Sequence, residues 1–477
     1  MAHPKPEDVD RGTRLLTAAR VLRLGAALAL LGMAALSVVE LGHWPRLREV
    51  LLTGEIHDLE PARIQGPLMR TAQGGADRVY LLSLQSDTVI EAKLRSGGHD
   101  RMRHLLHVDL RALDPASATI AWQRRLRTFE DGASDGLDLR AIELLGVDGG
   151  TLWLNLRGPL AVALSDGSAL ADGARIDTVN PAMAGKRVPD LGYVAFGAHG
   201  LQLTLSDATQ WRIDGTDWSA APRDTPARDP ARIGAPAERR YTSHFQVRGL
   251  ALGARWLGVL TDEEADDLKR EPTMSGRRPE EMSALTRHIL AANHVPQPLS
   301  VAPKPYRLWS ARVTQVSTAP PDWPPELPNN WGTRPQFSDY QPLPEAPSFL
   351  QAGLLGAATR SERALWYREP DSVLVLHHET VGEGGRLALA RVAGPGGRVM
   401  WTAVLPLTVL ESVLPGESAL VLVGSGPPPA APGTAPANPD GAPAPELHEK
   451  LVRVALADGA LAVFDLSEAS LHRGDAR

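Results

Sequence analysis

The chain has 477 residues, of which 43% are hydrophobic and 22% charged, and its net charge is −6 at pH 7. This composition is that of an ordinary globular protein, so it excludes wholesale disorder, a coiled coil and a multi-pass membrane protein, and the acidic balance argues against a nucleic-acid partner. No cysteine is present, which excludes disulfides, thiolate chemistry, Cys-ligated metals and a lipid-anchored N-terminal cysteine. The 44 glycines and 40 prolines predict frequent turns.

The N-terminus predicts a membrane anchor. Residues 24–39, LGAALALLGMAALSVV, carry no charge, and with their apolar neighbours they form a run long enough for one transmembrane helix over 21–43. More basic residues precede the run (Lys5, Arg11, Arg14, Arg20, Arg23) than follow it closely (Arg46, Arg48). The positive-inside rule then places residues 1–20 in the cytoplasm and the bulk of the chain in the periplasm of a bacterial inner membrane, after a linker over 44–75. A signal peptide with a cleavage site at Ala35-Leu36-Ser37 and a buried core helix are the alternatives.

From residue 76 to 470 the chain repeats one order of elements: strand, loop, strand, tight turn, strand. Asp or Gly marks the tight turns at 114, 166, 207, 396 and 458, and Asp-Gly is a strong hairpin signal because it supplies positive φ at low cost. The repeat predicts an all-β fold, a β-propeller of about six to seven four-stranded blades, with a pair of β-sandwiches as the alternative. The strands are expected at 79–84, 104–113, 120–129, 152–156, 160–164, 193–196, 201–205, 210–213, 373–377, 387–392, 399–405, 420–423, 451–456 and 461–466, and in the gaps at 244–248, 255–260 and 307–315.

The segment VDLRALDPASATIAWQRRL, which ends in a strand carrying Trp122, resembles the repeat of quinoprotein-type propellers. In that repeat an Asp/Gly turn precedes a strand whose tryptophan docks between blades, and Trp211 and Trp401 occupy similar positions. Residues 306–355 also resemble part of an uncharacterised family of membrane-tethered bacterial proteins. The quinoprotein-type enzymes often use an adjacent cysteine pair beside their cofactor, and this chain has no cysteine.

Four insertions are predicted between the strands. The segment 221–240 is rich in Pro, Arg and Asp, and 425–446 contains no apolar side chain larger than Ala, so a surface loop and a disordered loop are expected. The insertion 261–305 opens with Thr261 followed three residues later by Glu264, which is a capping box that starts a short helix. The fourth insertion, 319–350, is irregular and rich in proline.

Motifs for chemistry are weak in this sequence. Gly132-Ala133-Ser134-Asp135-Gly136 matches a nucleophile pattern but lacks the strand and helix that such a pattern requires, so a solvated turn is expected. On a strand, only His377 and Glu379 of His377-His378-Glu379 share a face, and His104 and His107 face opposite sides, so no metal set forms. The acids of 262–267 suit a helix start better than a calcium loop, and no P-loop or dinucleotide motif occurs. No cofactor and no metal are predicted.

The segment 319–350 interleaves prolines with four aromatic residues, Trp323, Trp331, Phe337 and Tyr340. Disordered segments are poor in aromatics, whereas Trp and Tyr are enriched at interface hot spots, so these residues are the candidates for partner binding. The alternative is a structural lid whose aromatic rings cover the edge of a blade.

These observations predict a binding or scaffolding module of the bacterial envelope, attached to the membrane by one helix and directed at an envelope protein. The outer-membrane assembly propeller is an analogy at the level of the fold. The alternative is an enzyme, either a quinoprotein-like oxidoreductase or a hydrolase, with a site on the propeller face. The sequence leaves the oligomeric state open.

Overall fold

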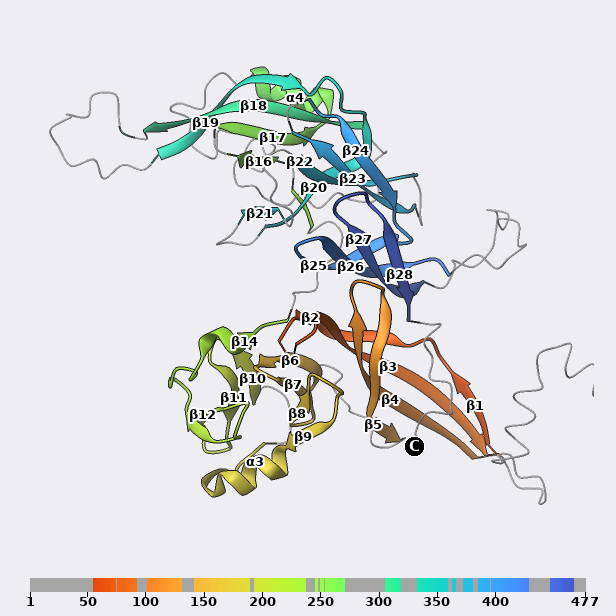
Figure 1. The fold of residues 1–477 in the computed structure, drawn as a ribbon, viewed down its shortest axis with the longest axis vertical. Coiled ribbons are helices and arrows are strands. Elements are labelled where there is room, and N and C mark those ends of the chain that lie inside the picture. Colours follow the sequence, from red (N-terminus) through yellow and green to blue (C-terminus); the bar gives the residue numbers. More distant parts are fainter. Residues whose placement is uncertain are drawn as a thin grey trace, which may run out of the picture. The chain divides into compact units, whose positions relative to one another are not determined.

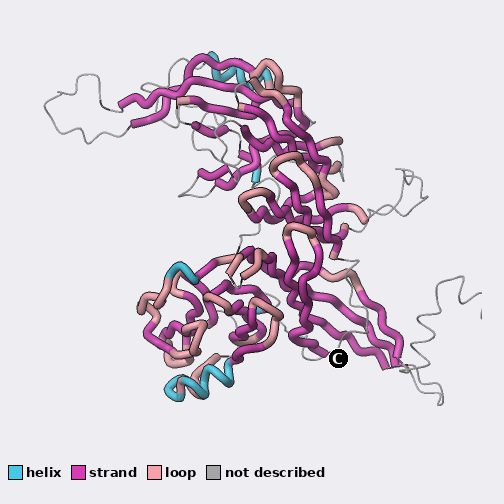
Figure 2. Tube along the Cα trace, viewed as in Figure 1, coloured by secondary structure: helices cyan, strands magenta, loops and turns pink. Residues whose placement is uncertain are grey.

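The computed structural model shows a fold built almost entirely from antiparallel strands (Figures 1 and 2). The chain divides into two compact units, one with residues 1–60, 86–106 and 129–135, the other with 61–85, 107–128 and 136–477. The structure describes residues 55–73, 75–91, 101–130, 141–188, 193–236, 245–247, 249–252, 254–270, 305–317, 319, 333–358, 363–365, 372–380, 385–394, 396–428 and 447–466. Within these ranges the predicted all-β class is confirmed.

The first sheet lies in the order β1-β3-β4-β5, and β2 also pairs with β3. Its strand β3 is divided between the two units, because β1 pairs with residues 87–91 and β2 with residues 78–84. The strands are β1 (Glu55–Leu59), β2 (Arg63–Thr71), β3 (Arg78–Glu91), β4 (Arg101–Asp114) and β5 (Thr119–Glu130).

The second sheet runs β6-β7-β8-β9 with β14 on the outer edge of β6, and the third runs β10-β11-β12-β13. In the chain, helix α3 (Gly173–Val179) connects the second sheet to the third. Its first turn is capped by the carboxylate of Asp172, which accepts from the Arg175 amide. The strands are β6 (Ile142–Asp148), β7 (Thr151–Leu156), β8 (Pro159–Ala163), β9 (Ala169–Asp172), β10 (Val194–Gly197), β11 (Gly200–Thr204), β12 (Gln210–Ile213), β13 (Ala220–Pro222) and β14 (Ile233–Gly234), and the 3₁₀ turns are η2 (Pro181–Met183) and η3 (Pro230–Arg232).

The large sheet joins two meanders, β16–β19 and β20-β22-β23-β24, through the pairing of Pro305 and Tyr306 with Leu350 and Phe349. The last sheet is the meander β25-β26-β27-β28. The elements are β15 (Gln246–Val247), β16 (Gly249–Leu252), β17 (Arg255–Leu260), α4 (Asp262–Arg270), β18 (Pro305–Ser317), β19 (Thr333–Pro342), β20 (Phe349–Ala358), β21 (Arg363–Leu365), β22 (Ser372–His378), β23 (Leu387–Ala393), β24 (Val399–Val404), β25 (Val409–Leu414), β26 (Ala419–Gly426), β27 (His448–Ala455) and β28 (Leu461–Asp465).

Three of the predicted turns share one geometry, in the hairpins 163–168, 393–398 and 455–460. In each hairpin, the amide of the first residue donates to the carbonyl of the sixth residue at 2.9 Å. The carbonyl of the first residue accepts from the amide of the fifth residue, which is a glycine with a φ of 70°, 85° or 75°. Asp166 and Asp458 each accept the amide two residues further on, at 3.0 Å. The turn chemistry that the sequence predicts is therefore present, because the glycine provides the positive φ and the aspartate satisfies the backbone.

Two tryptophans connect neighbouring sheets in the same way. Trp122 of β5 donates its Nε1–H to the Leu164 carbonyl at 3.3 Å, and Trp401 of β24 donates to the Leu456 carbonyl at 3.0 Å. Each acceptor lies three residues before the positive-φ glycine of the hairpin in the following sheet. Trp211 differs, because it donates to the Thr209 hydroxyl of its own hairpin at 3.1 Å.

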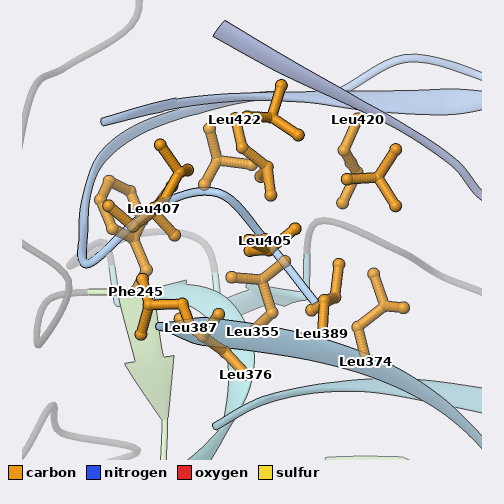
Figure 3. Close-up of a cluster of buried hydrophobic side chains, with 14 of the residues drawn as sticks. Phe245, Leu355, Leu374, Leu376, Leu387, Leu389, Leu405, Leu407, Leu420 and Leu422 are labelled. Atoms are coloured by element: carbon orange, nitrogen blue, oxygen red, sulfur yellow. The ribbon is translucent and has the colours of Figure 1, made fainter. Parts of the chain in front are cut away.

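Leucine-rich layers hold the sheets of the second unit together. Figure 3 shows one of them, in which side chains of the large sheet such as Leu374 and Leu389 point toward Leu420 and Leu422 of the last sheet, with Leu405 between. All of these side chains are almost completely buried. Burying a leucine contributes roughly 1.5–3 kcal/mol, so this layer is a major source of stability.

The first and last sheets of the chain also pack on each other. Their shared cluster joins Leu68 and Leu81 of the first sheet to Val423 and Leu451 of the last. The Ile64 amide donates to the Glu449 carboxylate, and Arg70 Nη1 donates to the Ala419 carbonyl at 3.4 Å. Segments more than 300 residues apart in the sequence therefore form one interface.

Several predicted boundaries differ from the structure. The linker 44–75 contains β1 and β2, whose polar and glycine-bearing sequences hide the strand pattern. The insertion 319–350 contains β19, which pairs with β18 along most of its length. The predicted capping box is confirmed, because Thr261 and Glu264 exchange side-chain-to-backbone hydrogen bonds at 2.9 and 3.2 Å at the start of α4.

The predicted tail 1–20 and transmembrane helix 21–43 lie outside the described residues. Among the residues that are described, no helix has the length and apolar character to cross a membrane. Of the predicted disordered loop 425–446, Ser425 and Gly426 belong to β26, and residues 429–446 lie outside the described ranges.

Candidate functional site

Of the four residues predicted to bind a partner, the structure describes Phe337 and Tyr340, while Trp323 and Trp331 lie outside the described ranges. Both described rings are half-buried and lie on β19. Each meets Trp256 of β17 edge-on, Phe337 at a centroid distance of 5.8 Å and Tyr340 at 6.2 Å. Edge-to-face packing is favourable for aromatic pairs, so the two rings are held in place.

A β-bulge places both rings on one side of the sheet. Residues three apart on a regular strand point to opposite faces. Here Asp339 and Tyr340 together oppose the single residue Ala311 of β18, and Asp339 adopts a φ of 57°. The extra residue shifts the alternation by one, so Tyr340 joins Phe337 against Trp256.

Trp256 itself is only 1% exposed and packs closely on two glycines. A Cβ added at Gly258 would lie 1.9 Å from the ring, and one at Gly249 would lie 2.4 Å from it. Larger residues at these positions would collide with the indole, so the glycines of β16 and β17 make room for it.

The β16–β19 meander has two different faces. Leu257 and Tyr306 point into the cluster shared with β20–β23. Trp256 and Trp309 point to the opposite face, where Phe337, Tyr340 and the helix residue Ala265 join them. This second face carries an aromatic cluster, which we call the β19 surface, and of its rings Phe337 and Tyr340 are only half-buried, whereas Trp256 and Trp309 are buried.

The histidine candidates lie on strands and contact groups close to them. His377 and His378 are half-buried, and burial lowers the pKa of both, partly offset at His377 by its hydrogen bond to the His378 carbonyl at 3.0 Å. Glu379 pairs with Arg386 at 2.8 Å. His104 and His107 lie 3.2 and 3.0 Å from the hydroxyls of Thr88 and Thr128.

Other predicted chemistry finds no assembled site. Within the part of the chain that the structure describes, no group of three His, Asp or Glu side chains is arranged to hold a metal ion. The Gly132–Gly136 motif lies outside the described residues. In the acidic run, Asp262, Glu263 and Glu264 form the first turn of α4, where the helix dipole favours negative charge.

Two polar groupings were not predicted from the sequence. One joins His57 to Asp87 at 2.6 Å, beside Glu55 and Arg103, which pair at 2.8 Å in the first unit. The other lines a cleft of about 280 Å³ between the start of β2, the end of β26 and the start of β27. Both bring together residues from separate strands, which no local sequence pattern marks.

The chain matches no protein-family model, and no curated protein shows significant sequence similarity to it.

Proposed function

We propose that the chain is a membrane-anchored β-propeller of about six blades that binds an envelope protein through the β19 surface. Six four-stranded meanders support the number of blades: β2–β5, β6–β9, β10–β13, β16–β19, β20 with β22–β24, and β25–β28. A ring also requires its first and last sheets to meet, and the cluster of Leu68 and Leu451 joins those two sheets. The repeated docking of Trp122 and Trp401 on the next hairpin fits blades stacked side by side.

The membrane anchor rests on the uncharged run 24–39 and the basic residues before it. Such an anchor would place the propeller in the periplasm, tethered to the inner membrane. A tethered propeller presents a broad rigid surface to other envelope proteins, which suits a scaffold.

The observation that carries the binding role is the arrangement of Phe337 and Tyr340. A bulge with a left-handed residue costs stability, and such features concentrate where a side chain must be aimed. Half-exposed aromatic rings fixed by packing lose little conformational entropy on binding, which is the usual property of interface hot spots.

The experiment is crosslinking in intact cells, followed by purification of the full-length protein in mild detergent and mass spectrometry. We expect a stoichiometric envelope protein to copurify with the unaltered chain and to be lost from the variant F337A/Y340A and from W323A/W331A. Tyr193→Ala is the matched control, because its ring is 38% exposed and lies outside the β19 surface. A partner retained in all variants, or a monomer without any partner, would contradict the proposal.

A further inference from the structure

The cleft at the junction of the first and last sheets has the properties of a ligand site. Its wall is formed by Pro61–Arg63 on one side and by Ser425 with Leu447–Glu449 on the other, and its volume is about 280 Å³. This size is at the lower end of small-molecule pockets, so it suits a ligand of about the size of a dipeptide.

A hydrogen bond between strands and apolar packing fix the walls of the cleft. The Ile64 amide donates to the Glu449 carboxylate, which ties β2 to β27 directly behind the opening. Ala62 is 3% exposed, and the apolar cluster of Ile64 and Leu451 continues below it. A site whose walls are fixed in this way need not be ordered by its ligand.

Arg63 provides the positive charge of the cleft, whose wall also holds the carboxylate of Glu449. Its side chain is exposed, and in the described part of the chain its guanidinium makes no hydrogen bond or ion pair. The nearest acid in the wall, Glu449, already accepts the Ile64 amide. His448 lies on the same side, with its Nδ1 3.5 Å from Asp465.

An unneutralised guanidinium presents a planar fork of N–H donors, which matches a carboxylate in two parallel hydrogen bonds. The rest of the wall is mixed: Pro61, Ala62 and Leu447, which is 45% exposed, are apolar, whereas Ser425, His448 and Glu449 are polar. We infer that the cleft binds a small carboxylate with a short apolar body, of the kind found at a peptide C-terminus, and that Arg63 is the residue that recognises it. This site is separate from the β19 surface and does not depend on the partner proposed there.

The test is a titration of N-acetyl-dialanine into the full-length protein in detergent, with saturation-transfer NMR as the readout. The C-terminal amide of the same peptide is the comparison ligand. We expect the free carboxylate to bind with a Kd on the order of 1 mM, as ordinary ligand efficiency predicts for about 14 non-hydrogen atoms. The amide should bind at least about tenfold more weakly, because a charge-assisted pair is lost.

Arg63→Gln should weaken binding of the carboxylate by at least about tenfold, and Arg63→Lys, which keeps the charge without the fork, should give an intermediate loss. Arg175→Gln on α3 is the control, because Arg175 is also an exposed arginine and lies away from the cleft. The urea midpoints of all three variants should match that of the unaltered protein. No binding of the peptide at 10 mM, equal binding of its amide, or equal affinities for the Arg63→Gln and Arg175→Gln proteins would each overturn the inference.

Discussion

At the scale of single residues, the contact between a tryptophan ring and a glycine recurs at two sheet junctions. A Cβ at Gly167 would lie 2.5 Å from Trp122, and one at Gly459 would lie 2.7 Å from Trp401. Tyr80 adds a second bond at the first junction, donating to the Leu164 carbonyl at 3.0 Å, and burial raises the pKa of this phenol to about 12. The phenol therefore keeps its proton and its role as a donor at any physiological pH.

Gly459→Ala should destabilise the protein by about 2–5 kcal/mol, the sum of the left-handed backbone strain and the displacement of Trp401. Gly185→Ala is the matched control, because Gly185 has almost the same φ, 74° against 75°, but no atom lies within 4 Å of its would-be Cβ. The Gly185→Ala variant should be destabilised by the backbone strain alone, which is about 1–2 kcal/mol. Urea unfolding measures both, and equal losses would show that Trp401 does not pack on this turn.

The two half-buried histidines predict a dependence of stability on pH. Burial lowers the pKa of His377 and His378 in the folded protein below the ordinary value of about 6.5 that holds in the unfolded chain. Above pH 6.5 both histidines are neutral in the folded and the unfolded protein, so they do not change the free energy of unfolding. As the pH falls through 6.5, the unfolded chain takes up protons first, so the free energy of unfolding decreases until the folded-state pKa is reached.

His377→Gln should reduce this loss, because each histidine contributes at most about 1.4 kcal/mol per pH unit. The measurement is the unfolding free energy in urea between pH 8 and pH 5. The variant and the unaltered protein should differ by a constant amount from pH 7.5 to 8 and should converge at lower pH. A constant difference over the whole range would contradict the role of His377.

At the scale of elements, the sequence marks most of the second, third and fourth strands of the six meanders but misses the first strand of five of them, with β10 as the exception. β2, β6, β16, β20 and β25 were not predicted. Segments such as RIQGPLMRT in β2 and FLQAGLLGAA in β20 contain glycine, proline or small residues in place of a clean alternation. Their strand conformation is decided by pairing with a longer neighbour, which intrinsic propensity does not report.

The bulge in β19 gives a prediction at this scale. Deleting Asp339 would remove the bulge and leave Phe337 and Tyr340 two residues apart, on the same face of a regular strand, so Tyr340 should keep its packing on Trp256 and the loss of stability should stay below about 1 kcal/mol. Asp339→Gly keeps the bulge and relieves the positive φ, so it should change stability by less than about 1 kcal/mol. Urea unfolding measures both variants, and a loss of about 2 kcal/mol or more in the deletion variant alone would mean that the bulge itself is needed to hold Tyr340 against Trp256.

At the scale of the whole molecule, the described residues form face-to-face apolar layers between sheets that contribute to stability. Separate apolar clusters join the second sheet to the third, the large sheet to the last, and the last sheet to the first. The contact between the first and last sheets is the one that links the two ends of the described chain.

A double-mutant cycle tests that contact. Leu68→Ala and Leu451→Ala should each cost about 2–5 kcal/mol, since both side chains are buried in the same cluster. Their effects should be coupled by at least about 0.5 kcal/mol. Leu68→Ala combined with Leu203→Ala, a buried residue of the third sheet, is the control pair and should be additive. Additivity in both pairs would contradict the packing of the first sheet on the last.

The sequence by itself determined the strand class, the hairpin turns at 166, 396 and 458 and the capping box of α4, because these depend on residues within a few positions of one another. The tertiary structure alone decided which sheets meet, how Phe337 and Tyr340 share a face, and that Arg63 stands beside Ser425 and His448. A cross-sheet contact depends on the position of the whole backbone, and a slip of one residue in register reverses the face of every side chain in a strand. The anchor and the tryptophans at 323 and 331 remain predictions of the sequence.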